Sequence, residues 1–227
     1  MNQVFYERVL KMTLSEIIAE STNWIPYMIG CSIGLSFFFW KRLPQSFQIL
    51  SFYLIWNLVI EVLAGIVMTN EINNLPLLHI YTLLELVIFT LFYWKVGIFH
   101  RWGTRNMWYL IAGISALIIL NSIFLQSIFT HNAYAKTMVQ VMLIVYAIAY
   151  IFQLNEKTEE VAALNLANAA ILIYYSASLF IFMAANFIVA ANLGNLLWEA
   201  NVIFNIIFHI LIFISIWKAS RARKLSF

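Results

Sequence analysis

The chain of 227 residues is 63% hydrophobic and only 10% charged, with a formal net charge of +3. Soluble domains carry about a quarter of their residues as charged side chains, so this composition excludes a soluble enzyme and predicts an all-α integral membrane protein. Its positive side chains lie beside the ends of predicted helices, where membrane topology accounts for them without a nucleic-acid partner. The lipid bilayer is therefore the first expected partner.

Residues 1–21 are predicted to form an amphipathic segment on the outer membrane surface, where they could also cover the mouth of a helix bundle. Apolar side chains recur through the segment and can enter lipid, while Glu7 lies one turn from Lys11. Acidic and basic residues are mixed where a signal peptide would have a basic start and an apolar core, so no cleavable signal is predicted.

Seven apolar segments follow, each about as long as the roughly 20 residues needed to cross the hydrocarbon of a bilayer. Short connections with Pro, Gly, Asn and charged residues separate them. The predicted spans are Thr22–Trp40, Ser46–Thr69, Leu75–Trp94, Met107–Leu125, Tyr134–Leu154, Leu166–Phe187 and Leu196–Trp217. Residues 22–217 are therefore expected to form a seven-transmembrane-helix bundle.

The orientation of this bundle follows from its basic residues, which favour the cytoplasmic side. Ten of the 13 Lys and Arg residues fall on one side of the predicted topology, and this number includes the four in the basic tail 218–227. Arg8, Lys11 and Lys136 fall on the other side. We expect an outside N-terminus and a cytoplasmic C-terminus, in a multi-pass protein of a cell membrane such as the bacterial inner membrane.

Two glutamates lie deep in neighbouring predicted spans. Glu61 comes 12 residues before Asn73, in the connection between the spans, and Glu85 comes 12 residues after it. At about 1.5 Å per helical residue the two carboxyl groups reach the same depth. An ionisable side chain there costs about 2.5 to 3.5 kcal/mol to insert. If the two faced one another, repulsion and desolvation would leave at least one protonated near neutral pH, which suits a proton-linked or cation-linked function.

Other polar side chains fall in the same layer of the bundle. Asn201, Asn205 and His209 recur every four residues and form one stripe, and Asn57 shares a helix face with Glu61. The candidate ligand-binding residues are Glu61, Glu85, Asn57, Trp56, His79, Asn121, Gln140, Tyr175, Ser178, Asn205 and His209.

Structural roles compete with ligand binding for many of these residues. Asn and Gln commonly form interhelical hydrogen bonds in membrane bundles, contributing about 0.6 kcal/mol each. Trp56 could pack in the bundle or form a pocket wall, and His79, near the outer boundary, could line a vestibule or hydrogen-bond a neighbouring helix. Lys136 and Glu199 are expected near the outer interface, where snorkelling or ion pairing would account for them and ligand binding is the alternative.

Several motifs resemble those of known enzymes and transporters, but their sequence context does not support these functions. The sequence GCSIG, residues 30–34, matches a hydrolase nucleophile elbow but lies inside an apolar span, so a G-x-x-x-G helix-packing face is the preferred interpretation. Zinc hydrolases of the alkaline ceramidase type use a histidine pair that the last span lacks, and the chain has no aspartate. Retinal needs a lysine in the last span, which has none. Sugar transporters with a three-plus-one-plus-three arrangement need similar first and last helix triplets, and the sequence shows no such internal repeat. No catalytic residue, metal or cofactor is predicted.

The final stretch NVIFNIIFHILIFISIWKAS followed by RARK resembles the last membrane helix and basic exit of membrane input domains of bacterial sensor kinases. The whole chain resembles uncharacterised bacterial seven-helix membrane proteins. This resemblance implies signal reception, without the kinase that normally follows. The expected function is a sensor or ligand-binding module that receives a small-molecule, lipid or proton signal and acts through a cytoplasmic or membrane signalling partner. A proton-coupled small-solute transporter and an intramembrane metal-dependent hydrolase remain alternatives.

Overall fold

The computed structural model describes residues 16, 20–99, 103–130, 132–153, 159–183 and 194–222. Within these ranges the chain is all-α, with seven α-helices, one 3-10 turn (η1) and one short π-helical segment (η2). The elements are α3 (Ile25–Phe38), η1 (Trp40–Arg42), α4 (Gln45–Thr69), α5 (Leu75–Val96), α6 (Thr104–Leu120), η2 (Asn121–Leu125), α7 (Ala133–Gln153), α8 (Glu159–Met183) and α10 (Gly194–Ala222).

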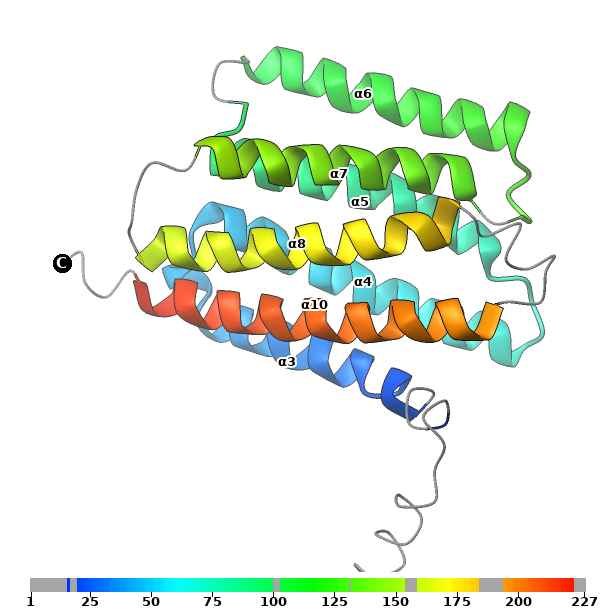
Figure 1. Cartoon of the computed structure of the whole chain (residues 1–227), viewed down its shortest axis with the longest axis horizontal. Helices are drawn as coiled ribbons and strands as arrows, with labels where there is room; N and C mark the ends of the chain where they lie inside the picture. Colours follow the sequence, from blue (N-terminus) through cyan, green and yellow to red (C-terminus); the bar gives the residue numbers. More distant parts are fainter. Residues whose placement is uncertain are drawn as a thin grey trace, which may run out of the picture.

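The helices lie side by side in one bundle and alternate in direction, so that the helix termini gather at two ends of the bundle (Figure 1). Helix α6 lies at one edge and α3 at the opposite edge. Between them α8 packs against both α7 and α10, and α5 packs against α4, α6 and α7. The buried centre of the bundle is therefore shared by α4, α5, α7, α8 and α10.

Six of these helices are long and apolar enough to cross a membrane, which makes the chain a multi-pass membrane protein. Each overlaps one of the predicted spans from the second to the seventh. The six candidate spans are Gln45–Thr69, Leu75–Val96, Thr104–Leu125, Ala133–Gln153, Val161–Met183 and Glu199–Ala222.

Helix α3 differs from the first predicted span. It contains 14 residues, about 21 Å at 1.5 Å per residue, because the chain turns before Pro26 and leaves the helix at Phe39. The seventh span therefore stays a prediction.

The expected close packing at Gly30 and Gly34 is wrong within this chain, since an added Cβ at either glycine would meet nothing within 4 Å.

Local sequence signals fix both ends of α5, the helix that carries Glu85. Asn73 Oδ1 accepts a hydrogen bond from the Leu75 amide at 2.9 Å, and a proline lies in the first turn, where a missing N–H costs nothing. Gly97 ends the helix in the left-handed conformation at φ 103°, and its N–H and that of Ile98 reach back to carbonyls of the last turn. Glu85 is thereby held near the middle of a 22-residue helix.

The two predicted end segments are described only in part. Most of residues 1–21, the expected amphipathic segment, lies outside the described residues, as does 223–227 of the basic tail. The rest of the tail continues α10 to Ala222. There the Arg221 guanidinium lies 4.2 Å from the centroid of the Trp217 ring, a pairing of cation and indole that suits a membrane interface.

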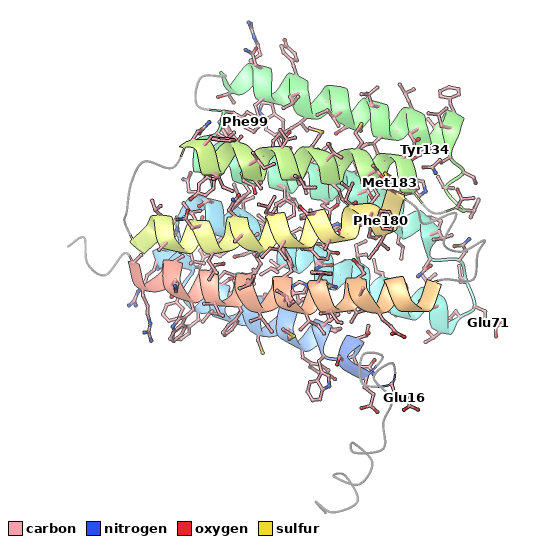
Figure 2. The ribbon with its side chains drawn as sticks, viewed as in Figure 1. Glu16, Glu71, Phe99, Tyr134, Phe180 and Met183 are labelled. Carbon is pink, nitrogen blue, oxygen red and sulfur yellow. The ribbon has the colours of Figure 1, made fainter. Side chains whose placement is uncertain are left out.

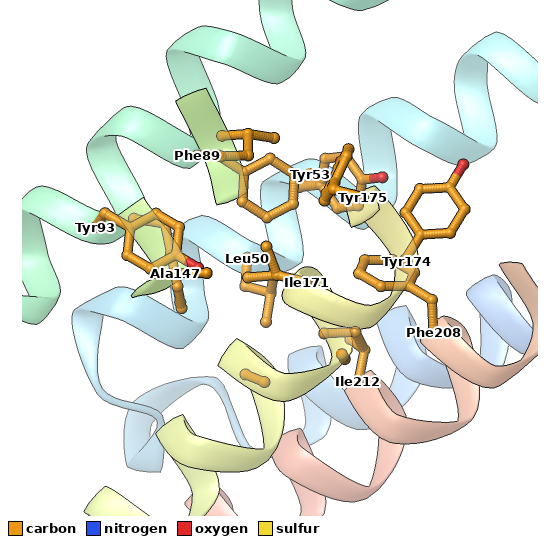
Figure 3. Packing of buried hydrophobic residues seen from close by; sticks show 14 of the residues in the cluster. Leu50, Tyr53, Phe89, Tyr93, Ala147, Ile171, Tyr174, Tyr175, Phe208 and Ile212 are labelled. Carbon is orange, nitrogen blue, oxygen red and sulfur yellow. The ribbon is translucent and has the colours of Figure 1, made fainter. Parts of the chain in front are cut away.

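Side chains fill the space between the helices, and Glu71 stands at the tip of the turn between α4 and α5 (Figure 2). Among the aromatic side chains of the core, four that come from four different helices pack against one another, and we call them the ring layer (Figure 3). They are Tyr53 on α4, Phe89 on α5, Tyr175 on α8 and Phe208 on α10. Their ring centroids lie 4.6 to 6.5 Å from their neighbours, the range of favourable aromatic contacts, and each side chain is at most 1% exposed.

Candidate functional site

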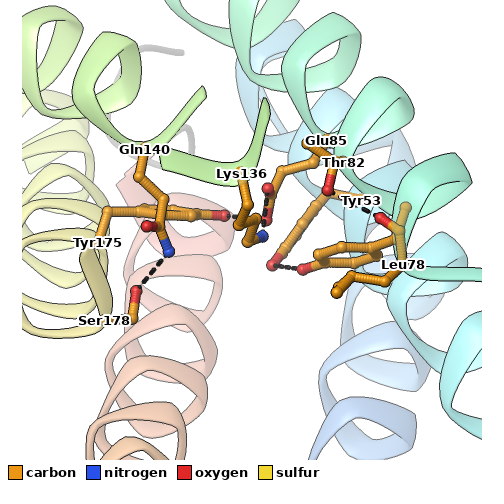
Figure 4. A network of polar contacts seen from close by, with 9 residues as sticks. Tyr53, Leu78, Thr82, Glu85, Lys136, Gln140, Tyr175 and Ser178 are labelled. Atoms are coloured by element: carbon orange, nitrogen blue, oxygen red, sulfur yellow. Dashed lines mark hydrogen bonds and ion pairs between the residues drawn. The ribbon is translucent and has the colours of Figure 1, made fainter. Parts of the chain in front are cut away.

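A buried ion pair joins α5 to α7 inside the bundle (Figure 4). Lys136 Nζ donates to Glu85 Oε2 at 2.5 Å, and the two side chains are 1% and 0% exposed. The Tyr175 hydroxyl on α8 donates to the other carboxylate oxygen, Oε1, at 2.7 Å. Three helices therefore meet at one carboxylate whose two oxygens are both hydrogen-bonded. We call Glu85, Lys136 and Tyr175 the ion-pair centre.

Aromatic rings surround the ammonium group of Lys136. Its Nζ lies 4.5 Å from the ring centroid of Tyr81, 5.3 Å from that of Phe182 and 5.9 Å from that of Tyr175. The faces of such rings attract a cation, by about 2 kcal/mol where the pair is desolvated. The Tyr81 hydroxyl is in turn hydrogen-bonded to that of Tyr53 at 2.9 Å. The cation is thus held by a carboxylate and by a box of rings.

The position of Lys136 within α7 is unfavourable by itself. Helix α7 begins at Ala133, so Lys136 lies in its first turn, close to the positive end of the helix dipole. A cation there typically loses about 0.3 to 1 kcal/mol, and burial of the charge adds a larger cost. Because nothing in α7 favours a lysine at this position, its placement depends on Glu85 from another helix.

A second hydrogen bond extends the ion-pair centre along α7. One turn beyond Lys136, Gln140 Nε2 donates to Ser178 Oγ on α8 at 2.8 Å, and both side chains are fully buried. The remaining Gln140 oxygen, Oε1, has no hydrogen-bond partner among the described residues. Of the predicted site residues, Glu85, Gln140, Tyr175 and Ser178 therefore come together, and Lys136 joins them.

His79 and Asn121 lie apart from this centre, at the junction between α6 and α7. His79 Nδ1 lies 2.8 Å from Ser122 Oγ in η2, and its Nε2 lies 3.4 Å from the Thr130 carbonyl oxygen. Asn121 Nδ2 donates to Gln126 Oε1 at 3.5 Å. Of the two roles expected for His79, the structure shows the hydrogen bond to a neighbouring segment.

A separate set of polar residues lies on α4 and α10, which we call the α4/α10 polar group. Its members are Trp56, Asn57 and Glu61 on α4 and Asn201, Asn205 and His209 on α10. The Asn57 amide nitrogen lies 3.4 Å from His209 Nε2, a long contact between the two helices. His209 is fully buried, and its Nδ1 has no hydrogen-bond partner among the described residues. Glu61 and Asn205 are only half-buried.

The predicted polar layer therefore divides into two groups. Sequence depth places Glu61 and Glu85 at one level, and a facing pair of carboxylates was one arrangement that this depth allowed. Both oxygens of Glu85 are instead hydrogen-bonded by Lys136 and Tyr175, so its electrostatic partner is a cation. Helix depth alone did not reveal this, because it says nothing about the direction of a side chain around its helix.

Lys136 is the site residue that sequence reasoning missed. It was expected near the outer interface, yet it is 1% exposed and bound to Glu85. The two ends of the connection before α7 are buried, with Gln126 8% and Asn132 0% exposed, although residues 127–130 between them are exposed. The first turn of α7 is therefore covered by the bundle. One signal could have found it, because Lys136 is the one Lys or Arg within any of the seven predicted spans.

The candidate site residues with side chains that could bind a metal do not gather. His79 and His209 contact different segments, and no group of three His, Cys, Asp or Glu side chains that could hold a metal occurs in the part of the chain that the structure describes. No family model, curated protein or solved structure matches the chain. The geometry of the two polar groups is therefore the basis for inferring a function.

Proposed function

We propose that the chain is an intramembrane receptor module that receives its signal at the ion-pair centre and passes it to a signalling partner. The observation that carries the proposal is a fully buried lysine and glutamate, joined at 2.5 Å within a bundle of membrane-spanning helices. Ionisable groups at this depth are costly, and they commonly mark functional sites in membrane proteins. Hydrogen bonds between uncharged side chains would tie the helices together at lower cost.

The ion pair makes the arrangement of three helices depend on one charge. Removing one partner of a buried pair leaves the other charge uncompensated, at a cost of about 3 to 5 kcal/mol. A proton on Glu85, or an anionic group of a ligand that competes for Lys136, would therefore favour a different packing of α5, α7 and α8. A shift of several kcal/mol is enough to reverse a two-state equilibrium.

The far ends of the same helices offer a route for output. Gln153 Nε2, in the last turn of α7, donates to the carbonyl of Ile98, directly after α5, at 3.3 Å. Movement at the ion-pair centre would thus reach the end of the bundle with the greater share of basic residues, where a cytoplasmic partner is expected. The likeness of α10 and its basic exit to sensor-kinase input domains supports the same direction of signalling.

The proposal is tested by measuring how the two helix ends respond to pH. With Cys31 replaced by serine, spin labels are placed at Lys95 on α5 and Phe152 on α7, both exposed near the same end of the bundle. We expect the distance between the labels to change as acid protonates Glu85. The change should persist in Glu61→Gln, the matched control, and disappear in Glu85→Gln. A response equal in all three proteins would exclude the ion-pair centre as the receiver.

Transport is the second candidate, favoured by the half-buried carboxyl group of Glu61 beside the contact between Asn57 and His209. A second carboxyl group could take up a proton from the first. Proteoliposomes with an entrapped pH-sensitive dye distinguish the two functions. Proton flux that is lost in both Glu61→Gln and Glu85→Gln would replace the receptor with a carrier, whereas a receptor gives no flux above that of protein-free liposomes.

A further inference from the structure

We infer that a narrow water-filled passage leads from the bundle end formed by residues 70–74 and 126–130 to Glu85, and that the passage stops at the ring layer. It is lined by Lys136 and Gln140 on α7 and by Asn132, the residue directly before that helix. We expect the signal to reach Glu85 through this passage, and this role rests on the proposed function. It gives the ion-pair centre access to water from one side of the membrane only.

The first support is a row of buried polar atoms that lack partners. Asn132 is fully buried, and neither its Nδ2 nor its Oδ1 has a hydrogen-bond partner among the described residues. The same holds for Oε1 of the fully buried Gln140 and Oδ1 of Asn121. Each such atom would cost about 1 to 3 kcal/mol if it stayed dry. Bound water is the usual partner for buried polar atoms of this kind.

The second support is the spacing of these residues. Lys136 and Gln140 are four residues apart and therefore lie on one face of α7, about 6 Å apart along the helix axis. Asn132 directly precedes the helix, and its carbonyl accepts a hydrogen bond from the Lys136 amide at 3.1 Å, which continues the row by one turn. The row begins at the connection between α6 and α7 and passes the Lys136 ammonium group on its way to Ser178. Water molecules at successive turns would form a continuous path that ends beside Glu85.

The third support is the apolar closure beyond Glu85. One turn further along α5, Phe89 belongs to the ring layer and is 0% exposed (Figure 3). Leu86 on α5 and Leu143 on α7, which flank this level, are also fully buried. Thr90 Oγ1, the next hydroxyl along α5, also has no hydrogen-bond partner among the described residues, but it lies beyond these side chains. The ring layer thus separates it from the passage.

Protons and water are the expected occupants of the passage. Lys136 and Glu85 neutralise one another, so the ion pair adds no net charge that would keep a small cation out of the passage. A hydronium ion reaching its inner end would transfer one proton to the Glu85 carboxylate, leaving a water molecule and a neutral carboxyl group. Apart from Lys136 on α7, the titratable groups that act on Glu85 are the phenols of Tyr53 on α4, Tyr81 on α5, and Tyr174 and Tyr175 on α8.

Silver ions, which are small, charged and thiol-reactive, test the passage in sealed vesicles that hold the full chain with Cys31→Ser. Single cysteines are placed at Asn132 and Gln140, with Ser178→Cys as a second probe of the inner end should Gln140→Cys fail to fold. Thr90→Cys is the matched buried control. Exposed Ser127→Cys and Lys41→Cys identify the two faces of the membrane independently of any assumed topology.

We expect silver to block later maleimide labelling at positions 132 and 140 when it is added on the Ser127 face, and to leave position 90 unprotected. Absence of protection at 132, 140 and 178, or protection of these positions from the Lys41 face, would overturn the passage. Equal protection at position 90 would overturn the closure by the ring layer. Protection as expected, together with a failed pH response of the spin labels, would reject the receptor and keep the passage.

Discussion

Glu85 and Glu61 are the same residue type at the same expected depth, yet the bundle treats them differently. Glu85 is fully buried, and both of its oxygens are hydrogen-bonded, one to a cation and one to a phenol. Glu61 is half-buried and lies one helical turn from the long contact between Asn57 and His209. The comparison sets a region organised around paired charges against one organised around neutral polar groups.

The difference shows what fixes a charge inside a membrane protein. A carboxylate can be fully desolvated where a cation and a hydrogen-bond donor compensate it, and these come from two other helices in the case of Glu85. Glu61, one helical turn from an amide and an imidazole, keeps part of its surface accessible. We therefore expect Glu85 to bear on stability and on function together, and Glu61 to contribute little to stability.

The largest effect is expected for breaking the ion pair on one side. Glu85→Gln or Lys136→Met alone should lower the free energy of unfolding by about 3 to 5 kcal/mol, because each leaves a buried charge unpaired. The double substitution should lower the free energy of unfolding by much less than the sum of the losses caused by the two single substitutions. Unfolding in mixed detergent micelles, followed by circular dichroism, gives the coupling energy. A coupling energy near zero would remove the distinction between the two glutamates.

A smaller loss is expected for Tyr175→Phe. The change removes one hydrogen bond to a charged group and leaves the ring in place, so the free energy of unfolding should fall by about 1.5 to 3 kcal/mol. Tyr174→Phe is the matched control on the same helix, since its hydroxyl makes no hydrogen bond to another described residue. The two variants are compared in the same unfolding assay. Equal losses would mean that the Tyr175 hydroxyl adds nothing to the ion-pair centre.

The contact between Asn57 and His209 should matter less. Its separation of 3.4 Å is long for a hydrogen bond, and interhelical hydrogen bonds in membrane proteins contribute about 0.6 kcal/mol on average. Asn57→Leu should therefore change the free energy of unfolding by less than Tyr175→Phe does. A loss as large as that of Glu85→Gln would show that α4 and α10 depend on a polar centre of their own.

The smallest effect on stability is expected for Glu61→Gln. The substitution keeps the size of a half-buried side chain, so the free energy of unfolding should change by no more than about 0.5 kcal/mol. It serves as the counterpart of Glu85→Gln in every assay. If Glu61→Gln destabilised the bundle as much as Glu85→Gln, the two carboxyl groups would be equivalent after all, and the comparison would fail.

Much of the fold could be predicted from local features of the sequence. Runs of apolar residues gave six of the predicted spans, because span length depends on residues that are close in the chain. The structure shows that the ends of α5 are also set locally, by Asn73 and Gly97. The length of α3 was overestimated, since an apolar run does not show where the helix turns or ends. Seven spans and their orientation remain expectations from hydropathy and basic residues.

The site could be predicted only in part. Its most informative residue, Glu85, was identified because a deep carboxylate is costly anywhere in a membrane. Tyr175, Gln140 and Ser178 were found by depth, and all three lie at the ion-pair centre or adjoin it. Lys136 was assigned to the interface, because counting residues from a loop assumes that the loop stays at the surface. Here Asn132, directly before α7, is already fully buried.

The sequence by itself determined that this is a helical membrane protein with carboxyl groups at bilayer depth, because hydrophobic length and the cost of inserting a charge depend on composition alone. Only the tertiary structure decided which carboxyl group is paired. That choice depends on the rotation of each helix about its axis and on the depth at which α7 begins, and both are set by packing among helices distant in the chain. Lys136 and Glu85 are 51 residues apart in sequence and 2.5 Å apart in the bundle.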